Sequence, residues 1–118
     1  MAVTIVNGPT IAAGEALSDA VDCSAGRILR ITTPAEWNPP ENLSFQVSSD
    51  GVFFNDVYTL EGREVVIPCR ASRSIFVQEA STGIGPQFAG VHLKFRSGTA
   101  AAPVPQLAQR VFAIAIET

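Results

Sequence analysis

Serine and threonine hydroxyls are common in this chain, but histidine, the usual base that activates such a nucleophile, occurs only once. The only histidine, His92, lies in a segment where apolar and polar residues alternate, and it shares the polar phase with Lys94 and Arg96. A serine or cysteine nucleophile needs a base held against it. A histidine on the outward phase of a strand is expected to be a solvated surface residue. The sequence therefore predicts no nucleophilic active site.

Carboxylates gather in one stretch of the chain. Asp50, Asp56, Glu61 and Glu64 could supply paired acids, but they cluster only along one hairpin region, where solvated turn residues are expected. Oxygen ligands from Asp50, Asn55 and Asp56 could bind calcium, although their spacing is not that of an EF-hand. An Asp-Gly pair also forms a turn without a metal. We therefore expect no catalytic residues, no metal and no cofactor, and we interpret the protein as not being an enzyme.

The two cysteines, Cys23 and Cys69, are too few for a disulfide framework and lack the C-x-x-C spacing of metal or redox sites. Each lies at or just after the end of a predicted strand. Three interpretations stay open: buried inert thiols, a disulfide within the chain, or disulfides between subunits that form outside the reducing cytosol. Both residues are therefore candidates for an interface or a disulfide.

The only tryptophan, Trp37, lies in a segment with three prolines, residues 34–42. Proline removes a backbone donor and fixes φ, so this segment is predicted to be a loop. An exposed Trp37 could stack on a sugar or anchor a partner protein, because an indole offers a large rigid apolar surface and one donor. Alternatively, the ring folds back and plugs one end of the domain.

The composition indicates a protein that packs against neighbours. Charged residues make up 16% of the 118 residues, whereas about 25% is usual in soluble domains. Lys94 is the only lysine among eight cationic residues. Arginine is enriched and lysine depleted at protein interfaces, although GC-rich codon usage has the same effect. The length fits one domain, residues 1–118, and we expect it to form a homo-oligomer.

Two classes of partner are not expected. The net charge is −3 and no basic run is present, so the chain lacks the charge density that binds a phosphate backbone. No apolar run approaches the roughly 20 residues that cross a bilayer, and the first residues do not resemble a secretion signal. We expect synthesis in the cytoplasm, no nucleic acid and no membrane.

Short apolar segments separated by Gly, Pro, Asn, Asp and Ser predict an all-β protein. The clearest segment, residues 43–48, alternates apolar and small polar residues and ends at Asp50-Gly51. The other predicted strands are residues 3–6, 17–23, 27–33, 57–60, 63–67, 74–79, 91–96 and 111–116. Their number and spacing predict a single antiparallel β-sandwich of jelly-roll type with about eight strands.

Two predicted surface features could contact other subunits. Alternation within residues 74–79 directs Phe76 outward, while Ile75 and Val77 face the core. Residues 100–105 are small and include Pro103 and Pro105, so we expect them to form an extended, exposed loop.

Several motifs follow one another in a distinctive order: Trp37, the run of residues 43–51 followed by Phe53 or Phe54, the run of residues 92–99, and Gln106 with Arg110. This order resembles that of a group of small structural proteins of tailed bacteriophages. It covers nearly the whole chain. The same runs are also similar to discoidin-like and galactose-binding-like β-sandwiches, many of which bind glycans through loops at one end.

The phage resemblance implies a virion protein that decorates the capsid or forms the base of a head fibre or spike. Its partners would be the major capsid protein, other virion subunits or further copies of itself, contacted through Phe76 and the loop with Pro103 and Pro105. The second similarity implies a glycan-binding module that gathers Trp37 with Tyr58 or Phe54 at one end. Cys23, Cys69 and residues 100–105 lie outside the resemblance.

Overall fold

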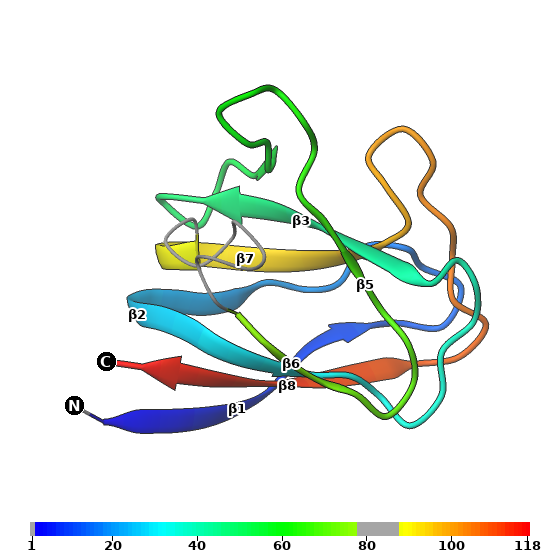
Figure 1. Ribbon diagram of the computed structural model, residues 1–118, viewed down its shortest axis with the longest axis horizontal. Coiled ribbons are helices and arrows are strands. Elements are labelled where there is room, and N and C mark those ends of the chain that lie inside the picture. Colours follow the sequence, from blue (N-terminus) through cyan, green and yellow to red (C-terminus); the bar gives the residue numbers. More distant parts are fainter. Residues whose placement is uncertain (1, 78–87) are drawn as a thin grey trace.

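The computed structural model describes residues 2–77 and 88–118, and it is all-β (Figure 1). The last two residues of the predicted strand 74–79 lie outside these ranges. No α-helix occurs in the described residues, and all strand pairs are antiparallel. The eight strands are β1 (Val3–Ile11), β2 (Val21–Thr32), β3 (Asn42–Ser48), β4 (Asn55–Asp56), β5 (Val66–Pro68), β6 (Ser74–Phe76), β7 (Ala89–Ser97) and β8 (Arg110–Glu117).

The strands form one continuous hydrogen-bonded sheet in the order β1-β8-β2-β7-β3-β4, with β5 added to β3 and β6 added to β2. The sheet folds into two layers because β2 changes partners along its length. Residues 21–23 of β2 pair with β7, Arg27 pairs with both β7 and β8, and residues 28–32 pair with β8 and, near their end, with β6. One layer is therefore β1-β8-β2-β6, and the other is β2-β7-β3 with β4 and β5 along the outer edge of β3. This arrangement confirms the predicted sandwich.

The predicted strands 17–23 and 27–33 are not separate, because residues 21–32 form the single strand β2, which corrects the sequence interpretation. Leu17 makes only an isolated bridge to Arg96. The register shifts between Cys23 and Arg27, so Ser24, Ala25 and Gly26 form an irregularity inside β2 instead of a turn between two strands. The backbone of Gly26 lies against the end of β8, where a Cβ atom would be only 2.0 Å from the carbonyl oxygen of Glu117. Only glycine allows this approach, which keeps the ladder continuous while the strand bends.

The first strand is also longer than predicted. β1 continues through Asn7, Gly8 and Pro9 to Ile11, with a register shift between Asn7 and Thr10. Proline cannot donate to a ladder, but a bulge on an edge strand tolerates it. The Gly-Pro pair therefore marks an irregularity within β1 and not its end.

The predicted hairpin of residues 57–67 forms, but its regular strands lie elsewhere. A turn at residues 59–63 closes it, and Tyr58 pairs with Glu64 only as an isolated bridge. The flanking segments β4 and β5 are the strands, and both pair with β3. The hairpin thus lies along the outer edge of β3. Its two arms form more backbone pairs with β3 than the single Tyr58–Glu64 bridge that they form with each other.

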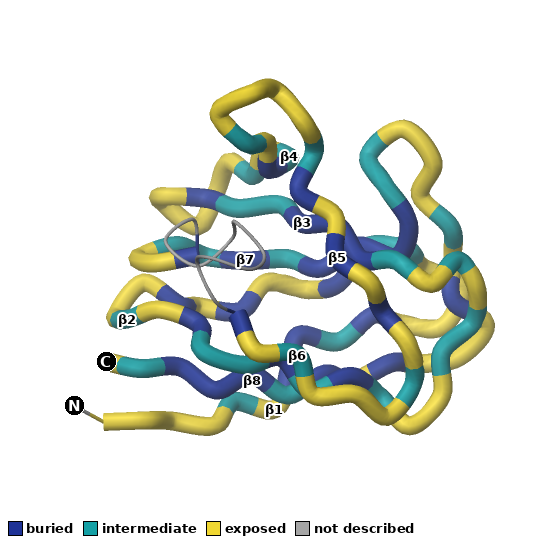
Figure 2. Tube along the Cα trace, viewed as in Figure 1, coloured by how far each residue is buried: buried dark blue, intermediate teal, exposed yellow. Residues whose placement is uncertain are grey.

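Figure 2 shows buried residues along strands of both layers. The core that they form lies between the layers and is built around aromatic rings. Edge-to-face contacts join Phe88 to Phe45 at 4.8 Å, Phe45 to Phe95 at 5.4 Å and Phe95 to Phe112 at 4.9 Å between ring centroids. Phe95 lies on β7 and Phe112 on β8, so their contact joins the two layers. Such pairs add about 0.5–1.5 kcal/mol each beyond the burial of their area.

Replacing Gly26 with alanine should destabilise the domain strongly. The new methyl group would overlap the backbone carbonyl of Glu117, and neither strand can retreat without breaking a ladder. We expect a loss of at least about 2 kcal/mol in the free energy of unfolding, measured by chemical denaturation.

Gly62→Ala is the matched control. Gly62 has φ +85° but no atom within 4 Å of its would-be Cβ, so only the backbone strain of about 1 kcal/mol should appear. Equal losses in the two variants would contradict a steric role for Gly26.

Candidate functional site

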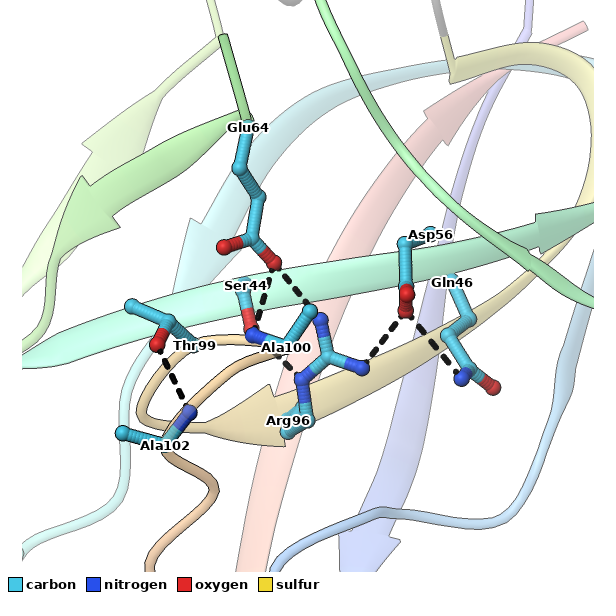
Figure 3. A network of polar contacts seen from close by, with 8 residues as sticks. All are labelled: Ser44, Gln46, Asp56, Glu64, Arg96, Thr99, Ala100 and Ala102. Atoms are coloured by element: carbon cyan, nitrogen blue, oxygen red, sulfur yellow. Dashed lines mark hydrogen bonds and ion pairs between the residues drawn. The ribbon is translucent and has the colours of Figure 1, made fainter.

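Arg96 on β7 is buried, which corrects its assignment to the outward, solvated phase of the strand. Its side chain is 7% exposed. Nε donates to Ser44 Oγ at 2.8 Å, one terminal nitrogen donates to Asp56 Oδ1 at 2.7 Å, and the other donates to Glu64 Oε2 at 2.7 Å (Figure 3). The reason is the hairpin along β3, which covers this part of the layer and brings its own carboxylates to the guanidinium.

The two carboxylates that could have formed an acid–base pair therefore share one cation. Glu64 also accepts a hydrogen bond from the backbone N–H of Ala100 at 2.9 Å, so the network ties the hairpin and the loop after β7 to the sheet. The hydrogen bond from Arg96 lowers the pKa of Asp56. Its contribution to stability is present above the ordinary aspartate pKa of about 3.9 and is lost as the pH falls through the lower folded value. Structural anchoring, not proton transfer, is what this arrangement can do.

Asp50 caps its own turn, which confirms the turn predicted at Asp50-Gly51. Its Oδ1 accepts hydrogen bonds from the backbone of Val52 at 2.8 Å and of Phe53 at 3.0 Å, and from Ser48 Oγ at 2.8 Å. The two backbone bonds are the main cause that lowers the pKa of Asp50 to about 2. The carboxylate is thus engaged by its own loop.

His92 is partly covered and not fully solvated. The backbone of Gly51 lies over its ring, where an added Cβ would be 3.3 Å from Cε1. The imidazole side chain is 25% exposed, and Nδ1 is 3.8 Å from Asp22 Oδ1. Within residues 2–77 and 88–118, no three His, Cys, Asp or Glu side chains come together in a way that could hold a metal ion.

Both cysteines are free thiols in the core. Cys23 is 1% exposed and Cys69 is 0% exposed. Burial raises the pKa of Cys23 to about 11 and that of Cys69 to about 12. A thiol with such a pKa is almost wholly protonated near neutral pH and is a poor nucleophile. In this structure the two residues act as small apolar packing groups.

Trp37 packs onto the core and also lines a cleft. The indole N–H donates to the carbonyl of Pro40 at 2.9 Å, and the ring meets Phe112 edge to face at 5.7 Å. This contact matches the plug interpretation. The rest of the ring borders a cleft of about 300 Å³, formed with residues of the same loop and of the turn before β6: Pro39, Glu41, Arg70, Ala71 and Arg73.

A buried amide holds the Trp37 loop in place. Gln106 is fully buried, and its Oε1 accepts from the backbone N–H of Asn38 at 2.9 Å while its Nε2 donates to the carbonyl of Asn38 at 2.9 Å. The same amide donates to Ser97 Oγ and accepts from Arg110 Nε. Gln106 and Arg110, which the sequence analysis singled out only through a resemblance, therefore fix the loop to β7 and β8.

The remaining sequence candidates, all within the described residues, do not line this cleft. Phe76 is 59% exposed on β6, and Pro103 and Pro105 are exposed in the loop between β7 and β8, as predicted. Phe54 follows β3 in the chain, whereas Trp37 precedes it. Phe54 instead lies under Lys94 Nζ, 4.5 Å from the ring centroid. Neither Phe54 nor Tyr58 lines the cleft beside Trp37, so the predicted grouping of Trp37 with one of them is not found at this cleft.

Comparisons of the chain with protein families, with curated proteins and with solved structures found no match. None of the described segments forms a helix of the length and hydropathy needed to span a membrane. The geometry of the described residues is therefore the basis for the function proposed below.

Replacing Arg96 with methionine should destabilise the domain by about 3–5 kcal/mol, because it leaves two partly buried carboxylates without their cation. The free energy of unfolding, measured by urea denaturation near neutral pH, tests this.

Adding Asp56→Asn and Glu64→Gln to Arg96→Met should recover part of the loss, since the unpaired charges are removed. A triple variant no more stable than Arg96→Met would show that the packing of the arginine side chain, and not its charge, anchors the hairpin.

Proposed function

We propose that this protein is a structural subunit of a tailed-phage virion, which decorates the capsid or forms the base of a head fibre or spike. In this role it is made in the bacterial cytoplasm and packs against the major capsid protein, other virion subunits or further copies of itself. The observation that carries the proposal is an apolar outer face on the layer β1-β8-β2-β6.

The strand register aligns three apolar side chains and Arg30 across this face, and the middle apolar residue, Ala115, is only 3% exposed. Ile5 on β1 is opposite Ala115 on β8, Ala115 is opposite Arg30 on β2, and Arg30 is opposite Phe76 on β6. Directly opposed residues project on the same side of a sheet. Ile5 is 55% exposed and Phe76 is 59% exposed, so the two ends of this row offer large apolar groups to a neighbour. The apolar outer face also includes Val3, Val111 and Ala113.

Charge on this face is sparse. Arg27 and Glu117 neutralise each other in an ion pair of 2.8 Å, which leaves Arg30 as the cation in the row. β1 also ends the hydrogen-bonded order of the described strands, and it carries no lysine on its outer edge. Exposed apolar surface beside an open strand edge favours association, with about 25 cal/mol per Å² buried before the costs of association.

The double variant Ile5→Asp, Phe76→Asp should abolish association, because two carboxylates would have to be buried against the partner. We expect the wild-type chain to sediment as an oligomer, or to co-sediment with particles produced from the same genome, and the double variant to remain a monomer in the supernatant.

Leu60→Asp is the control, since Leu60 is fully exposed on the hairpin and lies away from the apolar outer face. A wild-type chain that stays monomeric and is absent from particles would overturn the proposed function.

A second function, a glycan-binding module, is favoured by one specific observation: the cleft beside Trp37. An indole ring and Pro39 border it, and Glu41 and Arg70 add hydrogen-bonding groups. Aromatic surface combined with a few polar groups is the usual composition of a small-ligand site.

The glycan function predicts that the wild-type chain binds members of a glycan array and that Trp37→Ala loses this binding while Tyr58→Ala keeps it. Tyr58 is an exposed aromatic residue of the hairpin and not of the cleft. Binding that survives in Trp37→Ala would reject the cleft as the glycan site.

A further inference from the structure

We infer that the cleft beside Trp37 recognises a saccharide that carries a carboxylate, with the sugar ring against the indole and the carboxylate on Arg73. The inference rests on the glycan function proposed above and names its ligand class. It does not depend on the apolar outer face.

The wall formed by Trp37 is fixed before any ligand binds. The indole N–H is held by the carbonyl of Pro40, and the ring edge is held by Phe112. Asn38, the next residue, exchanges two hydrogen bonds with the buried amide of Gln106. A side chain held in this way loses little entropy on binding, so contact with it contributes more fully to affinity.

The opposite wall, the turn that carries Arg70 and Arg73, is fixed by Thr33. The Thr33 hydroxyl donates to the carbonyl of Arg70 at 2.7 Å and accepts from the N–H of Arg73 at 2.7 Å. The backbone N–H of Thr33 donates to the carbonyl of Arg73 at 2.8 Å, and that of Ser72 donates to Pro34 at 2.7 Å. Ser72 has φ 57°, a conformation that a residue with a side chain adopts at a cost and that these bonds maintain.

The polar groups of the cleft differ in how far they are already paired. Arg70 and Glu41 form an ion pair with each other, so together they offer donors and an acceptor for sugar hydroxyls without a net charge. Arg73 has no ion pair among the described residues, and its only described side-chain bond is a long one of 3.4 Å to the carbonyl of Ala71. A guanidinium fork binds a carboxylate through two parallel hydrogen bonds, and Arg73 contributes such a fork to the lining of the cleft.

Size and shape favour a sugar ring over a simple anion. The cleft of about 300 Å³ is at the small end of ligand sites, which is suitable for one ring. A phosphate or acetate ion would bind only the guanidinium and would make no contact with the apolar surface of the indole and Pro39. A carboxylate-bearing sugar has an apolar C–H face for the indole, hydroxyls for Glu41 and Arg70, and an anion for Arg73.

Fluorescence of Trp37 reports binding directly, because it is the only tryptophan in the chain. We would titrate the full chain with glucuronate, with glucose, which has the same ring without the carboxylate, and with acetate. We expect glucuronate to bind about tenfold or more tightly than glucose, as for a charge-assisted hydrogen bond, and acetate to bind more weakly than glucuronate. Arg73→Gln should reduce the preference for glucuronate over glucose to within about twofold.

Arg63→Gln is the matched control, an exposed arginine of the hairpin outside the cleft, and it should keep the preference. Thermal melting of Arg73→Gln checks the fold, which should persist because Thr33 holds the turn through backbone atoms.

Equal binding of glucose and glucuronate, or a preference unchanged in Arg73→Gln, would overturn the inference but leave the glycan function standing. Acetate as tight as glucuronate would identify a simple anion site. Absence of all saccharide binding would reject both the inference and the glycan function.

Discussion

The close approach of the Gly26 backbone to the carbonyl of Glu117 is the constraint on which the sandwich depends. β2 must pair with β7 in one layer and with β8 and β6 in the other, and Arg27, directly after the irregular residues 24–26, pairs with both β7 and β8. No side chain fits at the point where the bent strand meets β8. Once β2 has crossed, Phe95 and Phe112 face each other from opposite layers and close the core.

Buried polar groups then determine where the loops lie. Arg96 gathers the hairpin and the loop after β7 onto one layer, and Gln106 gathers the proline-rich loop onto the ends of β7 and β8. The Arg96 guanidinium and the Gln106 amide both have hydrogen-bonding partners, which avoids the desolvation cost of an unpaired buried group. Because the chain has few charges, the networks of Arg96 and Gln106 provide much of its buried polar bonding. In each network, a single side chain holds a long segment that lacks regular secondary structure.

The two proposed binding surfaces use different parts of this framework. The apolar outer face belongs to regular strands, where opposed residues of β1, β8, β2 and β6 line up by register. The cleft belongs to loops that Thr33 and Gln106 hold in place. A subunit could therefore pack against a virion shell through its strands while the cleft between its loops stays open to a sugar.

Local patterns in the sequence were sufficient to predict the all-β class, the positions of β3, β7 and β8, the turn at Asp50-Gly51 and the outward direction of Phe76. These features follow from alternation and turn chemistry, which act between near neighbours. The merging of two predicted strands into β2, the burial of Arg96 and the cleft beside Trp37 could not be predicted in this way. Their partners are distant in sequence: Arg96 meets Asp56 across 40 positions and Glu64 across 32. A polar residue on the outward phase of a strand is exposed unless another segment covers it, and only the tertiary structure decides which segment does.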